Sequence, residues 1–219
     1  KIYGMGGADT ITGNAGTDTI VGGEGDDIII VASAGDANSD IIDGGGGSDT
    51  LRLSAGSHAF DNDARIQNIQ TITLNASGTT VNLGGQSEGL TISGGNGDDD
   101  ITSGSGSDII DAGSGSDIIY GKVGSDTISL GNNDNASDTV IMDITDGLDL
   151  IKQFKAGSTN GDIFKYTGNL NDVESSQNLS NGSNNTDEIL SDDFISQSKN
   201  ASLDIVNLVI GFQTGITQN

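Results

Sequence analysis

The stretch 94–129 reads GGNGDDDIT, SGSGSDIID, AGSGSDIIY and GKVGSDTIS, four consecutive units of nine residues. Each of these units places Gly at the fourth position, Asp at the sixth and Ile at the eighth. The same kind of unit recurs at 4–12, 13–21, 22–30, 35–43 and 44–52, and in a degenerate form at 133–141. A polar chain that keeps one register over ten units is typical of a repeat architecture and not of a disordered polymer.

Each unit divides into a tight turn and a short strand. Gly at the first, second and fourth positions allows the backbone to reach positive φ and turn sharply. The strand that follows reads D-x-U-x, where U is a large aliphatic residue, and it is too short to bury more than the U side chain. Two units are therefore expected to form one turn of a flattened solenoid, with equivalent turns about 18 residues apart.

This geometry predicts that sixth-position Asp residues stack from alternate units. The expected neighbours are Asp9 with Asp27, Asp18 with Asp40, Asp27 with Asp49, Asp99 with Asp117, Asp108 with Asp126, and Asp117 with Asp138. Adjacent rungs lie roughly 4.8 Å apart, so bare carboxylates would repel each other. A Ca²⁺ ion between them would gather two carboxylates and several carbonyl oxygens at about 2.3–2.6 Å.

The composition narrows the classes of partner and site. The net charge is −24 and the pI near 4.1, which argues against nucleic acid and against an anionic membrane as partners. Cys is absent, so disulfides and thiolate metal sites are excluded, and no apolar run is long enough to span a bilayer. The acids comprise 28 Asp and 4 Glu, and Asp beside Gly, Asn and Ser is typical of turns and of hard-cation sites.

The units fit the pattern G-G-x-G-x-D-x-U-x, and over about 4–52 and 94–141 the chain resembles the RTX family of bacterial type I-secreted proteins. The resemblance implies an all-β fold: a parallel β-roll or β-solenoid with calcium-filled turns, calcium-free middle rungs and a C-terminal β cap. About six Ca²⁺ ions would be sandwiched between rungs. The implied carboxylate ligands are Asp9, Asp18, Asp27, Asp40, Asp49, Asp99, Asp108, Asp117, Asp126 and Asp138. The implied main-chain carbonyl ligands are those of Gly4, Gly7, Gly13, Gly16, Gly22, Gly23, Gly25, Gly44, Gly45, Gly47, Gly94, Gly95, Gly97, Gly104, Gly106, Gly113, Gly115, Gly121 and Gly124.

Calcium is expected to be part of the folding reaction. One aliphatic side chain per nine residues provides little burial against the conformational entropy lost by the backbone. Binding of a metal to sites that exist only in the folded chain adds directly to the free energy of folding.

Four segments are expected: a first array at 1–52, a loop and calcium-free rungs at 53–93, a second array at 94–141, and a capping region at 142–219. In the middle segment Leu74, Leu83 and Ile92 are nine residues apart, and Ile72, Val81 and Leu90 fall in the register of the sixth-position Asp. These spacings favour one continuous stack over 65–141, with a separate small β domain as the alternative. Residues 53–64 break the period and are expected to form a loop.

The capping region has a different composition and holds five of the eight aromatic residues. The stretch 149–164, DLIKQFKAGSTNGDIF, resembles the module that follows RTX arrays in secreted proteins. Residues 171–200 are rich in Ser, Asn and Asp and are expected to hold a long mobile loop, whereas 203–212, LDIVNLVIGF, alternates like a strand. The resemblance also suggests an uncleaved C-terminal secretion signal nearby, and a chain that begins at Lys1 is expected to be a piece of a longer protein.

The sequence contains no complete motif of an enzyme active site. Residues 85–89 read GQSEG around Ser87, but the single His of the chain, His58, lies upstream and no helical pattern follows, so a polar turn is the better interpretation. His58 has no second His to share a metal with and is expected in an exposed loop.

The favoured interpretation is therefore a calcium-dependent extracellular structural module of a bacterial cell-surface protein, similar to a surface-layer protein, that folds and assembles with copies of itself on Ca²⁺. The alternatives are a module of a type I-secreted adhesin, or the non-catalytic tail of a secreted protease, lipase or toxin.

Overall fold

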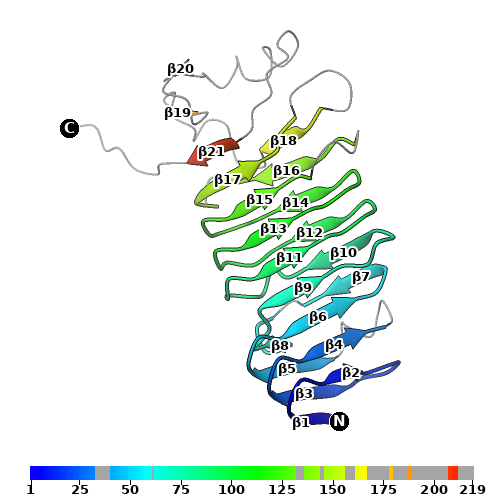
Figure 1. Ribbon diagram of the computed structural model, residues 1–219. Coiled ribbons are helices and arrows are strands. Elements are labelled where there is room, and N and C mark those ends of the chain that lie inside the picture. The colour runs from blue at the N-terminus through cyan, green and yellow to red at the C-terminus, as the bar shows by residue number, and fades with distance from the viewer. Residues whose placement is uncertain are drawn as a thin grey trace, which may run out of the picture.

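A computed structural model describes residues 1–32, 40–60, 62–131, 136–143, 146–155 and 161–166, together with the backbone of three short strands further on. These parts of the chain contain strands and turns, with no helix long and apolar enough to cross a membrane. The strands stack into a parallel β-solenoid of about seven turns, which Figure 1 shows rising from β1 at the N-terminal end to β17. The predicted all-β fold, a parallel β-solenoid, is confirmed.

Three sheets form the walls of the solenoid. In hydrogen-bonding order, the long sheet contains β2 Thr10–Thr12, β4 Ile28–Val31, β6 Thr50–Leu53, β9 Thr71–Thr73, β11 Thr91–Ser93, β13 Ile109–Asp111, β15 Thr127–Ser129, β17 Leu148–Lys152 and β21 Asn207–Gly211. The first short sheet contains β1 Ile2–Gly6, β3 Thr19–Glu24, β5 Ile41–Gly46 and β8 Ile66–Gln67. The second short sheet contains β18 Ile163–Tyr166, β16 Thr139–Met142, β14 Ile118–Tyr120, β12 Asp100–Thr102, β10 Thr79–Asn82 and β7 Gly56–Ala59.

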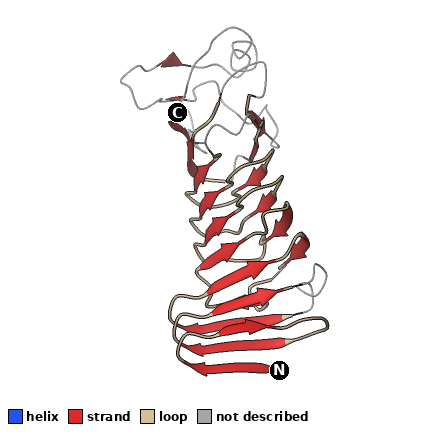
Figure 2. Cartoon of the chain, turned by 45° about the vertical axis from the view of Figure 1, so that its right-hand side comes forward, coloured by secondary structure: helices blue, strands red, loops and turns tan. Residues whose placement is uncertain are grey.

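The chain alternates between the long sheet and one short sheet, and the short sheet changes midway. Up to β6 the partner wall is the first short sheet, and from β9 onward it is the second. Between them β6, β7 and β8 belong to three different sheets, so this one turn has three sides. The long sheet continues in parallel pairing from β2 to β17 across this change, which Figure 2 shows as an unbroken stack of rungs.

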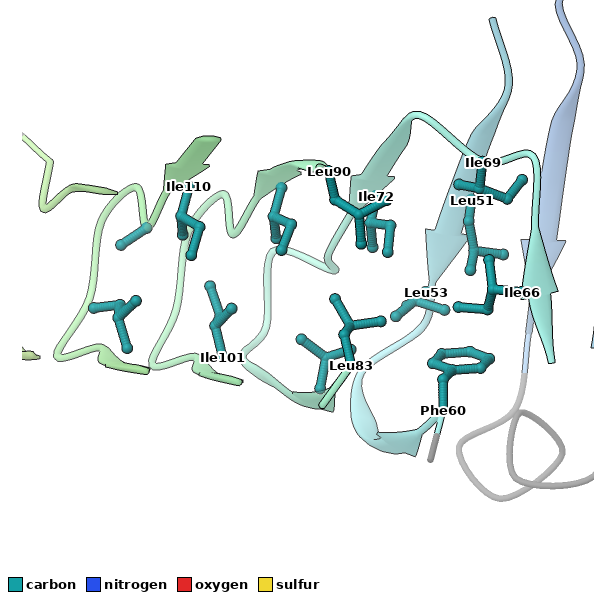
Figure 3. Close-up of a cluster of buried hydrophobic side chains, with 14 of the residues drawn as sticks. Leu51, Leu53, Phe60, Ile66, Ile69, Ile72, Leu83, Leu90, Ile101 and Ile110 are labelled. Atoms are coloured by element: carbon teal, nitrogen blue, oxygen red, sulfur yellow. The ribbon is translucent and has the colours of Figure 1, made fainter. Parts of the chain in front are cut away.

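The core is built around a file of eighth-position aliphatic side chains, and further buried residues such as Leu53, Leu83 and Leu130 pack against it. Ile29, Leu51 and Ile101 have no exposed surface, and Ile110 has only 1%. Figure 3 shows Ile101 and Ile110 projecting from opposite walls into the space between them. Full burial of each such side chain contributes about 1.5–3 kcal/mol. One buried aliphatic residue per unit is the amount that the repeat pattern predicts.

The expectation of a simple loop at 53–64 is wrong. This segment contains β7, which pairs in parallel with β10, and the ring of Phe60 is completely buried beside it. His58 on β7 is also completely buried and its Nε2 lies 2.8 Å from the carbonyl oxygen of Ser54, so the expected exposed loop His is wrong as well. Burial lowers the pKa of His58. Strand β7 forms the third side of the middle turn and is the first strand of the second short sheet.

The expected register of the middle segment is wrong, because the residues in the eighth-position places are Ile72 and Val81 and not Leu74 and Leu83. Ile72 pairs with Leu51 and Ile92, and Val81 pairs with Ile101, so both belong to the core file and not to the Asp positions. Val81 and Ile92 are eleven residues apart instead of nine, and these two inserted residues shift the apparent nine-residue period. Leu90 does hold a sixth-position place, because its N–H donates to Asp108 Oδ1 at 2.7 Å.

The C-terminal end of the stack is covered by strand and aromatic contacts. Strand β21 pairs antiparallel with β17, within the stretch 203–212 that alternates like a strand. The rings of Phe154 and Phe164 stack with centroids 4.2 Å apart. Most of the expected mobile loop at 171–200 lies outside the described residues, which include there only the antiparallel strand pair β19 Asn178–Leu179 and β20 Asp187–Glu188.

Candidate metal centre

One column of side chains stands where the chain enters the long sheet, and we call it the long-sheet column. Its members in order are Asp9, Asp27, Asp49, Gln70, Leu90, Asp108, Asp126 and Asp149. The N–H of Asp9 donates to Oδ1 of Asp27, and the N–H of Asp27 to Oδ1 of Asp49, both at 2.8 Å. Asp108 donates in the same way to Asp126 at 2.8 Å. Each carboxylate is thus held by the backbone of the preceding rung.

A second column, the short-sheet column, stands where the chain enters the two short sheets. Its carboxylates are Asp18 and Asp40 beside the first short sheet, and Asp99, Asp117, Asp138 and Asp162 beside the second. The N–H of each residue again donates to Oδ1 of the next, at 2.8 Å for Asp18 to Asp40 and for Asp99 to Asp117, and at 2.9 Å for Asp117 to Asp138. The structure therefore brings together all six pairs of neighbouring carboxylates that the repeat geometry predicts. Their assignment as metal ligands stays a prediction.

Two further carboxylates extend the columns and were missed at the level of sequence. The N–H of Asp126 donates to Asp149 Oδ1 at 2.9 Å, and that of Asp138 to Asp162 Oδ1 at 3.1 Å. A signal was present, because 144–152 reads ITDGLDLIK and 157–165 reads GSTNGDIFK. Both stretches keep Gly or Asn at the fourth position, Asp at the sixth and a large apolar residue at the eighth, so they are degenerate repeat units.

Neutral groups take the carboxylate places between the two arrays. The N–H of Asp49 donates to Oε1 of Gln70 at 2.6 Å, and Leu90 follows as the next member of the long-sheet column. In the short-sheet column Thr79 precedes Asp99 and donates its N–H to Asp99 Oδ1 at 2.6 Å. The hydrogen-bonded ladder thus continues beyond Asp49 on an amide oxygen, without the negative charge.

The second carboxylate oxygen distinguishes these residues from ordinary turn aspartates. Oδ2 is buried and accepts no hydrogen bond in Asp9, Asp27, Asp49, Asp99 and Asp126. A buried charged oxygen without a partner costs free energy, so such atoms call for a missing partner. A cation is the partner that fits, because hydrogen-bond donors already hold Oδ1.

The glycines leave space around this oxygen. A Cβ on Gly22 would lie 2.3 Å from Asp27 Oδ2 and 2.4 Å from the carbonyl oxygen of Gly44 in the next rung. Gly23 has φ +118°, and a Cβ there would lie 2.1 Å from the carbonyl oxygen of Met5. Carboxylate and carbonyl oxygens therefore face a space that only a small group can enter, and an oxygen shell of this kind suits Ca²⁺.

Other predicted carbonyl donors occupy equivalent places. A Cβ on the first-position glycine would lie 2.5–2.7 Å from Oδ2 of the Asp in the same unit at Gly4, Gly44, Gly94 and Gly121. Glycines at the second and fourth positions face a carbonyl oxygen of a neighbouring rung, as at Gly45, Gly113 and Gly124. The turns of both arrays are thus built alike.

The pKa values reflect the cost of burying these carboxylates. Burial raises the pKa of Asp99 and of Asp126 to about 7, although a backbone N–H bond to each carboxylate opposes the rise. Neighbouring carboxylates add to the rise, Asp117 at Asp99 and Asp149 at Asp126. Burial likewise raises the pKa of Asp149 to about 6. A bound dication would reverse this cost by favouring the charged form.

The carboxylates are stacked along two columns and do not surround a common point. In the described part of the chain, no three His, Asp or Glu side chains converge as a ready-made metal site. Any cation between rungs must therefore take most of its oxygens from main-chain carbonyls, as the glycine turns allow.

A family model describes this arrangement. The model of the RTX calcium-binding nonapeptide repeat matches 1–30, 34–57 and 91–135. The chain carries RTX repeats. Among curated proteins no match to the chain was found.

The RTX repeats account for the stacked turns, and the match stops where the structure departs from the pattern. It ends within β7 of the three-sided middle turn and resumes at residue 91, and it leaves out the degenerate units that supply Asp149 and Asp162. RTX nonapeptide repeats bind Ca²⁺ and are typical of secreted bacterial proteins.

Ser87 in the GQSEG stretch lies in a polar turn. Its N–H and its hydroxyl both donate to the carboxylate of Asp63, at 2.9 and 2.7 Å, and the neighbouring Gln86 is buried. These contacts give Ser87 the role of fixing the turn against the three-sided rung.

Proposed function

We propose that this chain is a calcium-dependent extracellular structural module whose solenoid is completed by Ca²⁺ ions between successive carboxylates. The observation that carries this proposal is the buried, unpartnered Oδ2 that recurs along the long-sheet column and is found again at Asp99 in the short-sheet column. The sixth-position Asp residues supply the charge, and the glycine carbonyls supply the remaining oxygens. In this proposal the carboxylate columns bind metal and not a substrate, and the module has a structural role and not a catalytic one.

The negative charge of the buried carboxylates opposes folding when no cation is bound. The chain carries −24, and most of the column carboxylates are buried within the stack. Without a cation, the folded state must either keep these like charges close together or protonate them, and both options cost free energy near neutral pH. Extracellular modules typically bind Ca²⁺ with dissociation constants of about 0.1–1 mM, so the chain would fold on reaching a calcium-rich exterior.

Limited proteolysis tests this folding role. With chelator we expect cleavage throughout the chain, and with a few millimolar Ca²⁺ we expect a protected fragment that spans β2 to β17. Mass spectrometry of the fragments locates its boundaries. Equal cleavage in both conditions would show that the solenoid needs no metal.

We further propose that the module belongs to a bacterial surface layer or a similar self-assembling coat. Six ions would bring the charge from −24 to about −12, so folded copies still repel each other. Acids at the fifth and ninth repeat positions could hold further calcium between copies, and we call Asp26, Asp43, Asp98 and Asp111 the rim carboxylates. Asp26 and Asp98 are exposed and each accepts a backbone N–H at 2.8 Å from the next rung, which holds one oxygen in place.

Assembly should need more calcium than folding, because the rim sites are exposed and weak. Light scattering and circular dichroism recorded in one calcium titration separate the two midpoints. We expect scattering to rise at higher calcium than the β signal, and to fall with added monovalent salt. A folded protein that stays monomeric up to tens of millimolar calcium would favour the adhesin module or the tail of a secreted enzyme.

A further inference from the structure

Asp146 lies outside the six predicted sites and behaves unlike the residues that share its repeat position. It is the third residue of the degenerate unit 144–152, and its carbonyl oxygen accepts the N–H of Gly124 at 2.7 Å. Third-position side chains elsewhere, such as Glu24, Asn96 and Val123, are exposed. Asp146 is only 1% exposed, so its carboxylate is turned into the stack.

The buried carboxylate of Asp146 is only half satisfied. Oδ2 accepts the N–H of Asp143, and the Tyr120 hydroxyl also interacts with the carboxylate, whereas Oδ1 is buried with no hydrogen-bond partner. The charged groups that act on Asp146 are Asp143 and Asp149, and both carry the same sign. Packing alone gives no reason to place a third acid there.

The backbone around Asp146 repeats the form of the glycine turns. Gly147 has φ +108°, and a Cβ on it would lie 1.8 Å from the carbonyl oxygen of Gly124. Gly124 and Gly147 are bridged in parallel, and Asp149 Oδ1 holds the N–H of Asp126. An unpartnered carboxylate oxygen, a second acid and at least one carbonyl oxygen therefore come together at this last turn.

We propose that Asp146 and Asp149 together bind one Ca²⁺ ion at the C-terminal turn of the long-sheet column, with the carbonyl oxygens of 122–124 completing the shell. This inference rests on the proposed calcium-dependent folding. It assigns a side-chain ligand to the third repeat position, at which Glu24, Asn96 and Val123 of other units are exposed. A second carboxylate from the same turn adds charge to this site, and ligand charge raises affinity for Ca²⁺.

Tyr120 provides a local probe of this site. Tb³⁺ occupies Ca²⁺ sites and luminesces when it lies close to an excited aromatic side chain. The chain has no Trp and three Tyr, so in a parent variant with Tyr3→Phe and Tyr166→Phe the only sensitiser is Tyr120. Titration of this parent with Tb³⁺ reports occupancy beside Asp146, and circular dichroism of the same samples reports folding.

In the parent, D146N should raise the Tb³⁺ concentration at half-maximal emission by about threefold or more, because one charged ligand is lost. The matched control is D100N, at an exposed seventh position, which should leave the curve unchanged. A D146N curve that superimposes on that of the parent overturns the proposal. If the parent folds equally with and without metal, the proposed function fails instead.

A charge-retaining variant covers the case in which D146N does not fold. If D146E then folds with calcium, a negative charge is required at this position and the proposal holds. If both variants remain unfolded at saturating calcium, Asp146 serves packing in the turn, and the proposal is wrong.

Discussion

The main-chain N–H of Asp99 donates a hydrogen bond of 2.8 Å to Oδ1 of Asp117, 18 residues further along the chain. The same bond joins rung to rung in both columns. It fixes one oxygen of each carboxylate and leaves Oδ2 facing the glycine turn, where it is buried without a partner at Asp99. One oxygen is thus used for structure, and the other is available for a cation.

Asp108→Asn should separate these two roles. Asn keeps an oxygen that can accept the Leu90 N–H, now 2.7 Å from Asp108 Oδ1, but it lacks the negative charge. We expect calcium-induced folding to need about threefold to tenfold more calcium, because fewer charged ligands lower the affinity. Circular dichroism during calcium titration measures this midpoint. The exposed Asp100→Asn is the control, and equal midpoints for the two variants would contradict the column scheme.

Gly22→Ala should prevent formation of its turn. The new Cβ would lie 2.3 Å from Asp27 Oδ2 and 2.4 Å from the carbonyl oxygen of Gly44, so the Asp27 side chain and the backbone at Gly44 must both move. Overpacking of this kind costs about 1–3 kcal/mol, and here it also fills the space for the ion. Gly6→Ala is the matched control, because its Cβ would meet nothing closer than 3.9 Å. Thermal unfolding in calcium should show a clear loss of stability for Gly22→Ala alone, and similar losses for both would be evidence against the turn geometry.

Acid should partly replace calcium. The pKa of Asp99 and of Asp126 is raised from 3.8 to about 7 in the metal-free fold, chiefly by burial. The folded state therefore binds more protons than the unfolded chain between these values. Its stabilisation by protons is complete below pH 3.8 and is lost as the pH rises through about 7. Chelated protein should show more β structure at pH 5 than at pH 8 by circular dichroism.

Calcium binding should have the opposite pH dependence, because the ligand carboxylates must lose their protons. The calcium midpoint is therefore expected to fall as the pH rises from 5 to 8. A chelated protein that is more folded at pH 8 than at pH 5 would mean that the buried carboxylates do not carry the cost assigned to them.

The repeat units were readable from sequence because each position has one physical task. Gly at the first position must avoid a clash with Asp Oδ2, and the eighth position must fill the core, so both the columns and the core file follow from the register alone. Asp27 and Ile29 illustrate this, since both are buried as their positions predict.

The middle and the cap could not be read in this way, because there the register is shifted by insertions. The two extra residues between Val81 and Ile92 made apolar core residues look like replacements for Asp. Gln70 was not predicted as a member of the column, because the repeat pattern marks this position by Asp. Its neutral amide oxygen nevertheless accepts the Asp49 N–H as a carboxylate would. The burial of His58 depends on a third wall that forms only when β7 meets β10, a contact between segments with no repeat in common.

The most direct test of the calcium-dependent solenoid is a far-ultraviolet circular dichroism titration of the chelated chain at neutral pH. We expect a disordered spectrum that converts cooperatively to β on addition of about 0.1–1 mM Ca²⁺, and no conversion with the same concentrations of Mg²⁺, which demands a tighter octahedral shell. A β spectrum that is already complete in chelator and unchanged by Ca²⁺ would contradict it.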